Sequence, residues 1–462
     1  MESQAHDWLT VLTEATGKLA GHLWGIPAIV LLVGTGLYLT LRLRFVQIRG
    51  FKHSLLLIAG KYDKASDPGE VSHFQALSTA LSATIGTGNI AGVATAIALG
   101  GPGAVFWMWI TALVGMASKY TSCSLALKFR VFHPDGSVSG GPMYTLARGL
   151  NLPWLGGLFA LFTLIASFGI GNMVQANSVA DGLSYIFPGA SEHKLAIGVV
   201  IAVLVGLVII GGIKRIALIA SRIVPFMAIV YCGAALAILA LNASEIPNAF
   251  ATIFNLALNP AAAGGGAVGA AIQYGVARGV FSNEAGLGSA PMAHAAARTH
   301  EPVREGLVAM MGPFVDTIII CTMTALVIVI MGAWGDARPE QLQGAALSAY
   351  AFDQALGNLG SWVVGFGLTF FAYSTIISWS YYGDRSAEYL FGERAVLPYR
   401  IIYTVLVVVG AYFPLQLVWN FADIANILMA APNLLSLILL AGLTKGLTDE
   451  YFVRYKRKND GG

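Results

Sequence analysis

Apolar runs long enough to cross a lipid bilayer follow one another along almost the whole chain. A membrane-spanning helix needs about 20 residues that are predominantly apolar. Eleven stretches meet this requirement, with approximate bounds 23–43, 71–97, 103–127, 152–178, 195–212, 221–241, 265–293, 305–332, 360–382, 398–416 and 421–443. The sequence therefore predicts an all-α, multi-pass protein of the cell membrane, with the lipid bilayer as its surroundings.

The composition agrees with a membrane protein and argues against several other classes. Hydrophobic residues make up 56% of the chain and charged residues 11%, whereas soluble domains have roughly 25% charged residues. A net charge of +3 is too small to indicate a nucleic-acid partner. Cys123, Cys232 and Cys321 lie inside apolar runs, so we expect buried thiols. Without nucleophile-elbow or metal-ligand spacing, we expect no enzyme activity, and we interpret His294 and His300 as surface residues.

The basic residues are distributed unevenly between the two sides of the predicted bundle. All but four of the 27 Lys and Arg residues fall in connections on one side, where Lys119 is counted with the connection after the third run. Cytoplasmic connections are enriched in Lys and Arg, and this enrichment sets the orientation. We therefore expect an extracellular N-terminal segment, 1–22, and a cytoplasmic C-terminal tail, 444–462. Adding or omitting a run would break the alternation, which supports eleven spans.

Glycine interrupts two of the runs at corresponding places. The second run contains Gly86-Thr-Gly-Asn89, and the seventh contains Gly286-Leu-Gly-Ser289. If the first helix and its basic loop, 23–70, are peripheral, helices 2–6 (71–241) and 7–11 (265–443) form two sets of five. The two interrupted helices then cross the membrane in opposite directions, as inverted repeats of transporters do. We expect a 5+5 inverted repeat with two discontinuous helices and an extra N-terminal helix.

The first interruption is a candidate ligand site. Irregular backbone at membrane depth is tolerated only where it is buried in protein or lines a cavity. Transporters use such breaks to bind substrate carboxylates with helix N-termini and cations with free carbonyls. We therefore expect Thr87, Gly88 and Asn89 to contact ligand. Gln75 and Ser78, earlier in the same run, are interpreted as groups that hydrogen-bond to another helix.

Of the charged residues inside predicted spans, where a charge costs about 2.5–3.5 kcal/mol on insertion scales, we single out Arg278, Glu284 and Asp316. Arg278 and Glu284 are six residues apart, which is not a neighbouring position on a regular helix. They form either a gating pair or a structural clamp, and we expect Arg278 near the mouth of a cavity. Asp316 follows a Gly-Pro kink and is either a cation or proton site or a partner of Arg278 or a hydroxyl.

The ninth run carries hydroxyl groups. Ser374, Thr375 and Ser378 supply the hard oxygen ligands that small hard cations prefer. Trp379 lies four residues after Thr375 and thus on the same helical face. The alternative is a Ser/Thr stripe that packs against another helix.

Three stretches together resemble a known family. Residues 100–115, GGPGAVFWMWITALVG, resemble the signature of the alanine/glycine:cation symporters. Residues 86–92 and 281–291 resemble the two unwound helices of that family. The sixteen-residue signature is highly specific, and the resemblance covers nearly the whole chain. It implies a leucine-transporter-type fold and uptake of alanine or glycine by alternating access, with sodium, or less often protons, as the coupled ion.

The resemblance also implies roles for individual residues. The substrate carboxylate would meet the amides of the first break, the amine would meet the second break, and Phe281 would act as a lid. The implied substrate-binding residues are Thr87, Gly88, Asn89, Phe168, Phe281, Ser282, Thr375 and Trp379. The implied sodium ligands are the carbonyls of Ser82 and Ile85 and the hydroxyls of Ser374 and Thr375. A second sodium site, found in some relatives, would use Thr84 and Asn89.

The sequence leaves several alternatives open. Trp379 and Phe281 leave more room for a methyl side chain than for leucine, which favours a small substrate. Sodium or proton coupling, alanine or glycine as substrate, and the oligomeric state, a monomer included, are not decided. An ion channel is a further alternative, although channels usually repeat a filter around a symmetric oligomer. Besides the co-transported sodium ion we expect no organic cofactor.

Overall fold

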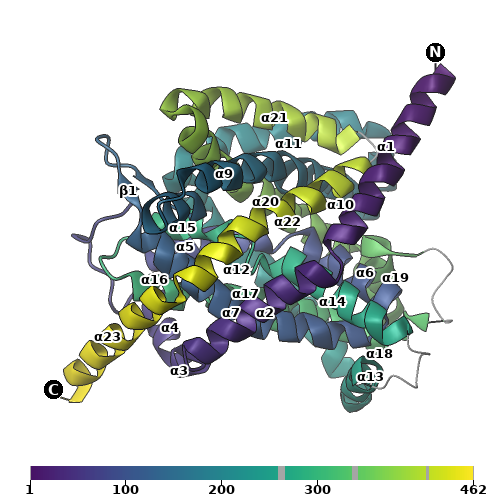
Figure 1. The fold of residues 1–462 in the computed structure, drawn as a ribbon. Coiled ribbons are helices and arrows are strands. Elements are labelled where there is room, and N and C mark those ends of the chain that lie inside the picture. Colours follow the sequence, from purple (N-terminus) through teal and green to yellow (C-terminus); the bar gives the residue numbers. More distant parts are fainter. Residues whose placement is uncertain (1, 259–265, 336–341, 413–415, 461–462) are drawn as a thin grey trace.

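The computed structural model describes residues 2–258, 266–335, 342–412 and 416–460, and nearly all of this part is helical (Figure 1). The α-helices are α1 (Glu2–Leu23), α2 (Ile26–Arg42), α3 (Val46–Arg49), α4 (Phe51–Ile58), α5 (His73–Thr84), α6 (Val93–Gly100), α7 (Gly103–Lys128), α8 (Pro142–Tyr144), α9 (Pro153–Phe168), α10 (Val174–Ile186), α11 (Lys194–Ile209), α12 (Gly212–Leu241), α13 (Ile246–Leu258), α14 (Gly266–Asn283), α15 (Ala290–Ala295), α16 (Pro302–Ala309), α17 (Met311–Pro313), α18 (Thr322–Ile330), α19 (Gly344–Leu356), α20 (Leu359–Phe391), α21 (Val396–Tyr412), α22 (Gln416–Leu439) and α23 (Ala441–Asp460).

Shorter elements complete this list. π-helical turns are η1 (Gly88–Gly92), η2 (Thr145–Gly149), η3 (Gly169–Met173) and η7 (Phe314–Cys321), and 3-10 turns are η4 (Pro188–His193), η5 (Ala243–Glu245) and η9 (Glu393–Ala395). Strands β1 (Val131–Phe132) and β2 (Val138–Ser139) pair in an antiparallel hairpin.

Eight helical stretches of the described residues are long and apolar enough to cross a membrane. They are Thr10–Arg42, Pro153–Ile186, Pro188–Ile209, Gly212–Leu241, Pro302–Ile330, Leu359–Phe391, Glu393–Tyr412 and Gln416–Leu439. A ninth candidate is a bent pair, His73–Thr84 and Gly88–Gly100, whose axes differ by 54°. The protein is therefore a multi-pass membrane protein. The predicted spans 103–127 and 265–293 are also helical, as α7 and α14–α15, but are not among these candidates.

The ends of two predicted spans lie outside the described residues. Residue 265 opens the predicted span 265–293, and residues 413–415 fall near the end of 398–416. The other predicted spans are each mostly helical, although several helices continue beyond the apolar run. For example, α20 continues to Phe391, nine residues past the predicted end of its span.

Both glycine-containing stretches interrupt their helices, as the sequence predicted. After α5, Ile85 adopts an extended backbone with ψ of 90°, and the chain re-forms a helix through η1. Between α14 and α15, Glu284, Gly286 and Gly288 have φ values of 54°, 86° and 92°. This left-handed region suits glycine and ends a right-handed helix.

Gln75 has a different role from the one predicted. Its backbone N–H donates to Ser72 Oγ, and its side-chain oxygen accepts from the Ser72 N–H at 3.0 Å. This reciprocal capping box starts α5. The prediction that Gln75 bonds to another helix was therefore wrong.

The interrupted helices lie inside the bundle, where α14 packs along α7 and α20 packs along α10, α9 and α5. In Figure 1, β1, α3, α4, α16 and α23 gather at one end of the molecule. Helices α6, α13, α18 and α19 gather at the opposite end. We call the first end the basic side, because the Lys- and Arg-rich connections lie there. The two interruptions lie between these ends.

Candidate functional site

The two interruptions lie against each other and against the middle of α20. A Cβ atom added to Gly88 would lie 3.0 Å from Ser282 Cα and 3.3 Å from the Phe281 ring. A Cβ atom on Gly86 would lie 2.6 Å from Thr375 Oγ1. Only glycine permits this approach, so the motif read from the sequence brings three helices to one point.

The four predicted sodium ligands lie together in this place. Thr375 Oγ1 lies 3.1 Å from the carbonyl oxygen of Ser82 and 3.4 Å from that of Ile85. The Ser374 hydroxyl lies 3.2 Å from the Ser82 carbonyl oxygen, and the Ser82 hydroxyl donates to the Ser374 carbonyl at 2.8 Å. All four residues are buried. Uncharged hydroxyl and carbonyl oxygens of this kind suit a hard cation.

Asp316 joins the two interruptions. Its Oδ1 accepts from Asn89 Nδ2 at 2.8 Å, and its Oδ2 accepts from the hydroxyls of Ser282 at 2.8 Å and Thr317 at 2.7 Å. Of the alternatives left open by the sequence, the structure shows hydroxyl partners for Asp316. Asn89 Oδ1 in turn accepts from the Gly86 N–H at 2.9 Å, which holds the first interruption. Thr84, predicted beside Asn89, donates to Ala80 of its own helix.

Gln175 on α10 was not singled out in the sequence. Its side chain faces the first interruption, where Oε1 lies 3.4 Å from the Thr87 N–H nitrogen and Nε2 lies 3.4 Å from Thr87 Oγ1. The sequence contains a signal that would have found it. Gly169-Ile-Gly-Asn172 repeats the Gly-x-Gly-Asn pattern of the first interruption and marks the π-helical turn η3 just before Gln175.

Glu284 and Arg278 do not pair with each other. Glu284 Oε1 accepts from the Trp379 ring N–H at 2.8 Å, and Oε2 accepts from the Ser289 hydroxyl at 2.5 Å. Glu284 therefore fixes Trp379, which is 1% exposed. Trp379 also lies against Gly171, where an added Cβ would be 2.5 Å away.

Arg278 lies above an aromatic pair on the side opposite the basic side. The Phe281 and Trp419 rings stack with centroids 5.1 Å apart, and the Arg278 guanidinium lies 5.6 Å and 5.8 Å from their centroids. Its nearest carboxylate oxygen is Oδ2 of Asp423, at 4.0 Å. Phe168 packs at 5.3 Å against the Tyr399 ring on α21.

Two cavities meet at Arg278. One, of about 340 Å³, is also lined by Asn177, Asp181 and Trp419, and the other, of about 330 Å³, by Asn420 and Asp423. This position agrees with the prediction that Arg278 lies near the mouth of a cavity. Both cavities reach Arg278, which lies over the Phe281–Trp419 stack, and both carry charged and amide side chains.

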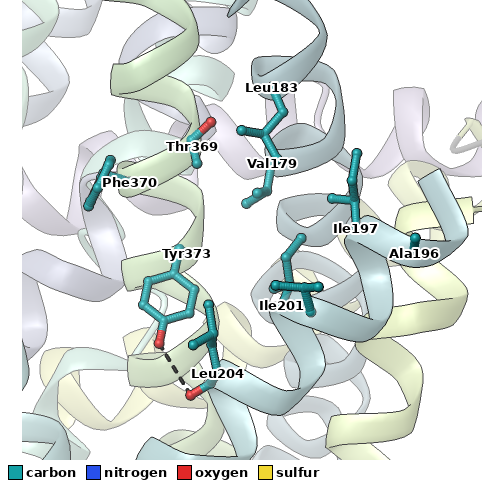
Figure 2. Close-up of a pocket in the computed structure, with 10 residues that line it drawn as sticks. Val179, Leu183, Ala196, Ile197, Ile201, Leu204, Thr369, Phe370 and Tyr373 are labelled. Carbon is teal, nitrogen blue, oxygen red and sulfur yellow. Dashed lines mark hydrogen bonds between the residues drawn. The ribbon is translucent and has the colours of Figure 1, made fainter. Parts of the chain in front are cut away.

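A third, larger cavity has a different character. Figure 2 shows this groove of about 430 Å³ between α10, α11 and α20. Thr369 and Tyr373 are its only polar lining residues, and Tyr373 already donates to the Leu204 carbonyl at 3.3 Å. With no charged group in its lining, the groove does not suit an amino acid that carries an ammonium and a carboxylate.

Two predictions about charged residues were wrong. Lys119 was counted with a connection, but it is 2% exposed within α7 and donates to the Asn283 carbonyl at 2.8 Å. His294 was interpreted as a surface residue, but it is fully buried beside Glu305. The prediction for His300 is confirmed, since 71% of its side chain is exposed.

Comparison with known proteins extends these observations. The model of the sodium:alanine symporter family matches residues 9–461. An uncharacterised transporter of Haemophilus influenzae is 52% identical over 94% of this chain and 95% of its own length. The sodium/alanine symporter AgcS of Methanococcus maripaludis is 51% identical over 93% of this chain and 94% of its own. The probable sodium/glutamine symporter GlnT of Bacillus subtilis is 37% identical over 97% and 93%. The chain therefore belongs to the sodium:alanine symporter family, a family of transporters.

Proposed function

We propose that this protein couples the uptake of a small neutral amino acid, alanine or glycine, to sodium by alternating access. The observation that carries the proposal is the placement of the Thr375 hydroxyl at 3.1 Å and 3.4 Å from two carbonyl oxygens of the interrupted helix. Family membership and the name of the AgcS relative support it. The GlnT relative is named for glutamine, so membership alone does not specify the substrate.

The chemistry of the buried groups favours sodium over protons. The Ser82, Ile85, Ser374 and Thr375 oxygens are uncharged and suit a metal cation, whereas a proton carrier needs a group that titrates. Asp316 is the nearest alternative carrier. It already accepts three hydrogen bonds from Asn89, Ser282 and Thr317, and protonation would weaken this arrangement. We assign Asp316 to joining the interruptions, where it holds Asn89 of the second cation site that the resemblance implies at Thr84 and Asn89.

The substrate is proposed to bind between the interruptions. The amides of Thr87 and Gly88 open the second half of the first interrupted helix, where the helix dipole favours a carboxylate. Gln175 hydrogen-bonds to Thr87 and positions that backbone. Ser282 and Phe281 of the second interruption would face the amine, and Trp379 with Phe168 would limit the side chain to a small one.

We further propose the complete membrane topology. Helix α7 and the pair α14–α15 are taken as spans three and seven, which gives eleven spans and two inverted sets, 71–241 and 265–443. The basic side is then cytoplasmic, with segment 1–22 outside and tail 444–462 inside. The second half of α7 carries Ser118, Lys119, Thr121, Ser122 and Ser124, which lower its mean hydropathy, and all five are buried in the bundle.

The cycle follows from these placements. Sodium bound between Ser82, Ile85 and Thr375 would brace α5 against α20. Substrate would then bridge the two interruptions, and the Phe281–Trp419 stack with Arg278 would cover it from the extracellular side. The molecule would next open on the basic side, where sodium and substrate leave together.

The decisive experiment is uptake of labelled L-alanine into proteoliposomes under an inward sodium gradient. Uptake should depend on sodium, should be competed by glycine and should show saturable counterflow, which a channel does not show. Potassium replaces sodium in one control, and a proton gradient replaces it in another. Uptake driven only by protons would overturn sodium coupling, and robust sodium-dependent leucine uptake would overturn the small pocket.

A further inference from the structure

A buried cluster of three titratable side chains joins the interrupted helices on the basic side. Glu305 on α16 accepts hydrogen bonds from His73, at the start of α5, and from His294 on α15, at 2.5 Å. All three side chains are 1% exposed or less. None of these residues contacts the groups to which substrate and sodium are assigned above. The cluster therefore requires a separate explanation.

The cluster is part of a seal that must open if a ligand is to leave on this side. Next to it, Val71 forms a parallel bridge with Ala297, and the Arg298 N–H donates to the Val71 carbonyl at 2.8 Å. Arg130 strengthens the same contact. Its guanidinium donates to carbonyls on both strips of chain, those of Pro68, Ala295, Ala297 and Thr299. These bonds tie the basic-side ends of α5 and α15 together.

The hydrogen bonds determine where an additional proton can bind. A carboxylate can only accept, so each Nδ1 that faces Glu305 carries a hydrogen, and the remaining variable position on each ring is Nε2. His294 Nε2 has no hydrogen-bond partner within the described part of the chain. His73 Nε2 lies 3.8 Å from Asp63 Oδ1, so a proton there would lie between two carboxylates.

The protonation of His73 depends on its burial and on every charged or titratable group around it. Burial opposes the protonated imidazole most strongly, Glu305 on α16 and then Asp63 in the connection after α4 favour it, and Arg304 on α16 opposes it. Arg130 after α7, Cys123 on α7 and His294 on α15 face Glu305. Two carboxylates thus contact the imidazole directly, and the arginines lie around them.

A path for the proton is also present. Asp63 lines a cavity of about 270 Å³ on the basic side, between residues 61–64, α16 and α23. The cavity is polar, and Asp63 is exposed. His73 itself is buried, but the Asp63 carboxylate beside it lines a cavity at the surface.

We propose that His73 is a proton-binding site whose occupation holds the basic side of the transporter closed. Neutral His73 already donates a hydrogen bond to the Glu305 carboxylate, and a second proton turns this contact into an ion pair. Separating a buried ion pair is unfavourable, so acid on the basic side slows the opening step. Loss of the proton leaves a neutral imidazole and a weaker seal. Only the transport readout of this proposal rests on the proposed function.

The test compares alanine counterflow in proteoliposomes for the wild type, His73→Gln and a control, His300→Gln. Glutamine keeps a donor toward Glu305 but does not titrate, and His300 is an exposed histidine on the same side. The pH is set equally on both faces, so no proton gradient drives the flux. Wild type and the control should slow by about threefold or more between about pH 8 and about pH 5.5, where histidine changes charge. The rate of His73→Gln should stay nearly constant, and a variant that slows like the wild type would overturn the proposal.

A second variant and a second measurement keep the proposal testable if His73→Gln does not fold or alanine is not transported. Asp63→Asn removes the exposed carboxylate at His73 Nε2 and leaves the Glu305 contact in place, so slowing should require a lower pH. Hydrogen exchange of residues 290–299 in detergent, corrected for intrinsic rates, reports the seal without any transport. Protection that rises with acid in the wild type but not in Asp63→Asn over the same range would support the site even if alanine uptake failed. Protection independent of pH would overturn it.

Discussion

Because glycine has no side chain, Gly86 and Gly88 allow three helices to meet at one site. Gly88 faces the backbone of Ser282, which cannot rotate out of the way as a flexible side chain could. Gly86 faces Thr375 Oγ1, which is held by two carbonyl groups. At the scale of single residues, the site depends as much on the lack of a Cβ atom at Gly86 and Gly88 as on the oxygens that would bind sodium.

Gly88→Ala should reduce alanine transport by at least about tenfold while the protein still inserts and folds. The added methyl group would lie 3.0 Å from Ser282 Cα and would force the interruptions apart. Gly157→Ala is the matched control, because nothing lies within 4 Å of its added Cβ. Initial uptake rates, normalised to purified protein, measure the effect. Equal rates for Gly88→Ala and Gly157→Ala would contradict the proposed site.

Thr375→Val should raise the sodium concentration for half-maximal uptake by about tenfold, which corresponds to about 1.4 kcal/mol. Valine has nearly the shape of threonine but lacks the hydroxyl that faces Ser82 and Ile85. Thr163→Val controls for loss of a buried hydroxyl, since Thr163 donates only to Phe159 in its own helix. Sodium titrations of uptake provide the measurement. An unchanged sodium dependence in well-folded Thr375→Val would remove Thr375 from the cation site.

Much of the residue-scale arrangement was accessible from the sequence, because motifs that interrupt helices also expose backbone groups. The four proposed sodium ligands, which the family resemblance implied, lie together in the structure. His294 and Lys119 were misjudged for a different reason. Their partners, Glu305 and Asn283, belong to other helices, and local sequence contains no information about which helices meet.

At the scale of elements, α23 packs on the basic side through an aromatic and histidine contact. His53 on α4 lies 2.6 Å from the Tyr451 hydroxyl, and its ring lies 4.1 Å from that of Tyr455. Burial, together with the positive charge of Arg304, lowers the pKa of His53 from 6.5 to about 4. Neutral His53 therefore favours the docked helix, and protonation favours its release.

Docking of α23 should weaken as the pH falls from about 6.5 toward about 4. The folded pKa lies below the ordinary value, so the stabilisation is present above pH 6.5 and is lost on acidification through this range. Amide protection of α23 should drop by up to about tenfold per pH unit, because one proton is linked to docking. Hydrogen exchange at several pH values measures this change. His53→Gln should remove the pH dependence, and a retained dependence would assign it to another group.

Element boundaries were harder to predict than element existence. Apolar runs indicate where a helix contacts lipid, but α20 continues to Phe391 beyond the run, with Ser386 and Glu388 still buried. The interruptions were predicted because glycine marks them. The π-helical turns within otherwise continuous spans were not predicted, since their hydrogen-bond shift depends on packing against neighbours.

For the whole molecule, the two sides of the site differ. Backbone bonds, Arg130 and the His–Glu–His cluster seal the basic side, whereas the opposite side contains two cavities that reach Arg278. The described conformation is thus tightly closed on the basic side. No carboxylate is among the four proposed sodium ligands, so the charge of a bound sodium ion is not neutralised within that set.

Transport should carry current, because one sodium ion and a zwitterionic amino acid together carry one positive charge. Moving one charge through 100 mV contributes about 2.3 kcal/mol, which corresponds to about fortyfold accumulation. Alanine added to proteoliposomes on a solid-supported membrane should give a transient current of positive charge in sodium buffer and none in potassium buffer. Uptake should also rise when a potassium diffusion potential makes the interior negative. Sodium-dependent uptake that produces no current and does not change with membrane voltage would contradict the movement of one positive charge per cycle.

The π-helical turns η1, η3 and η7 each hold about one more residue per turn than an α-helix. They belong to the site, since η1 contains Gly88 and Asn89, η3 directly precedes the segment of Gln175, and η7 contains Asp316. Each extra residue is equivalent to a single-codon insertion. Deleting one residue from Phe314–Cys321 would return the turn to α-helical spacing and change the direction in which Asp316 points toward Asn89 and Ser282. A substitution, in contrast, alters a single side chain and leaves the register intact. We therefore expect transporters built on this plan to change substrate preference by exchange of lining residues, and we expect gaps in these turns to be rare among relatives.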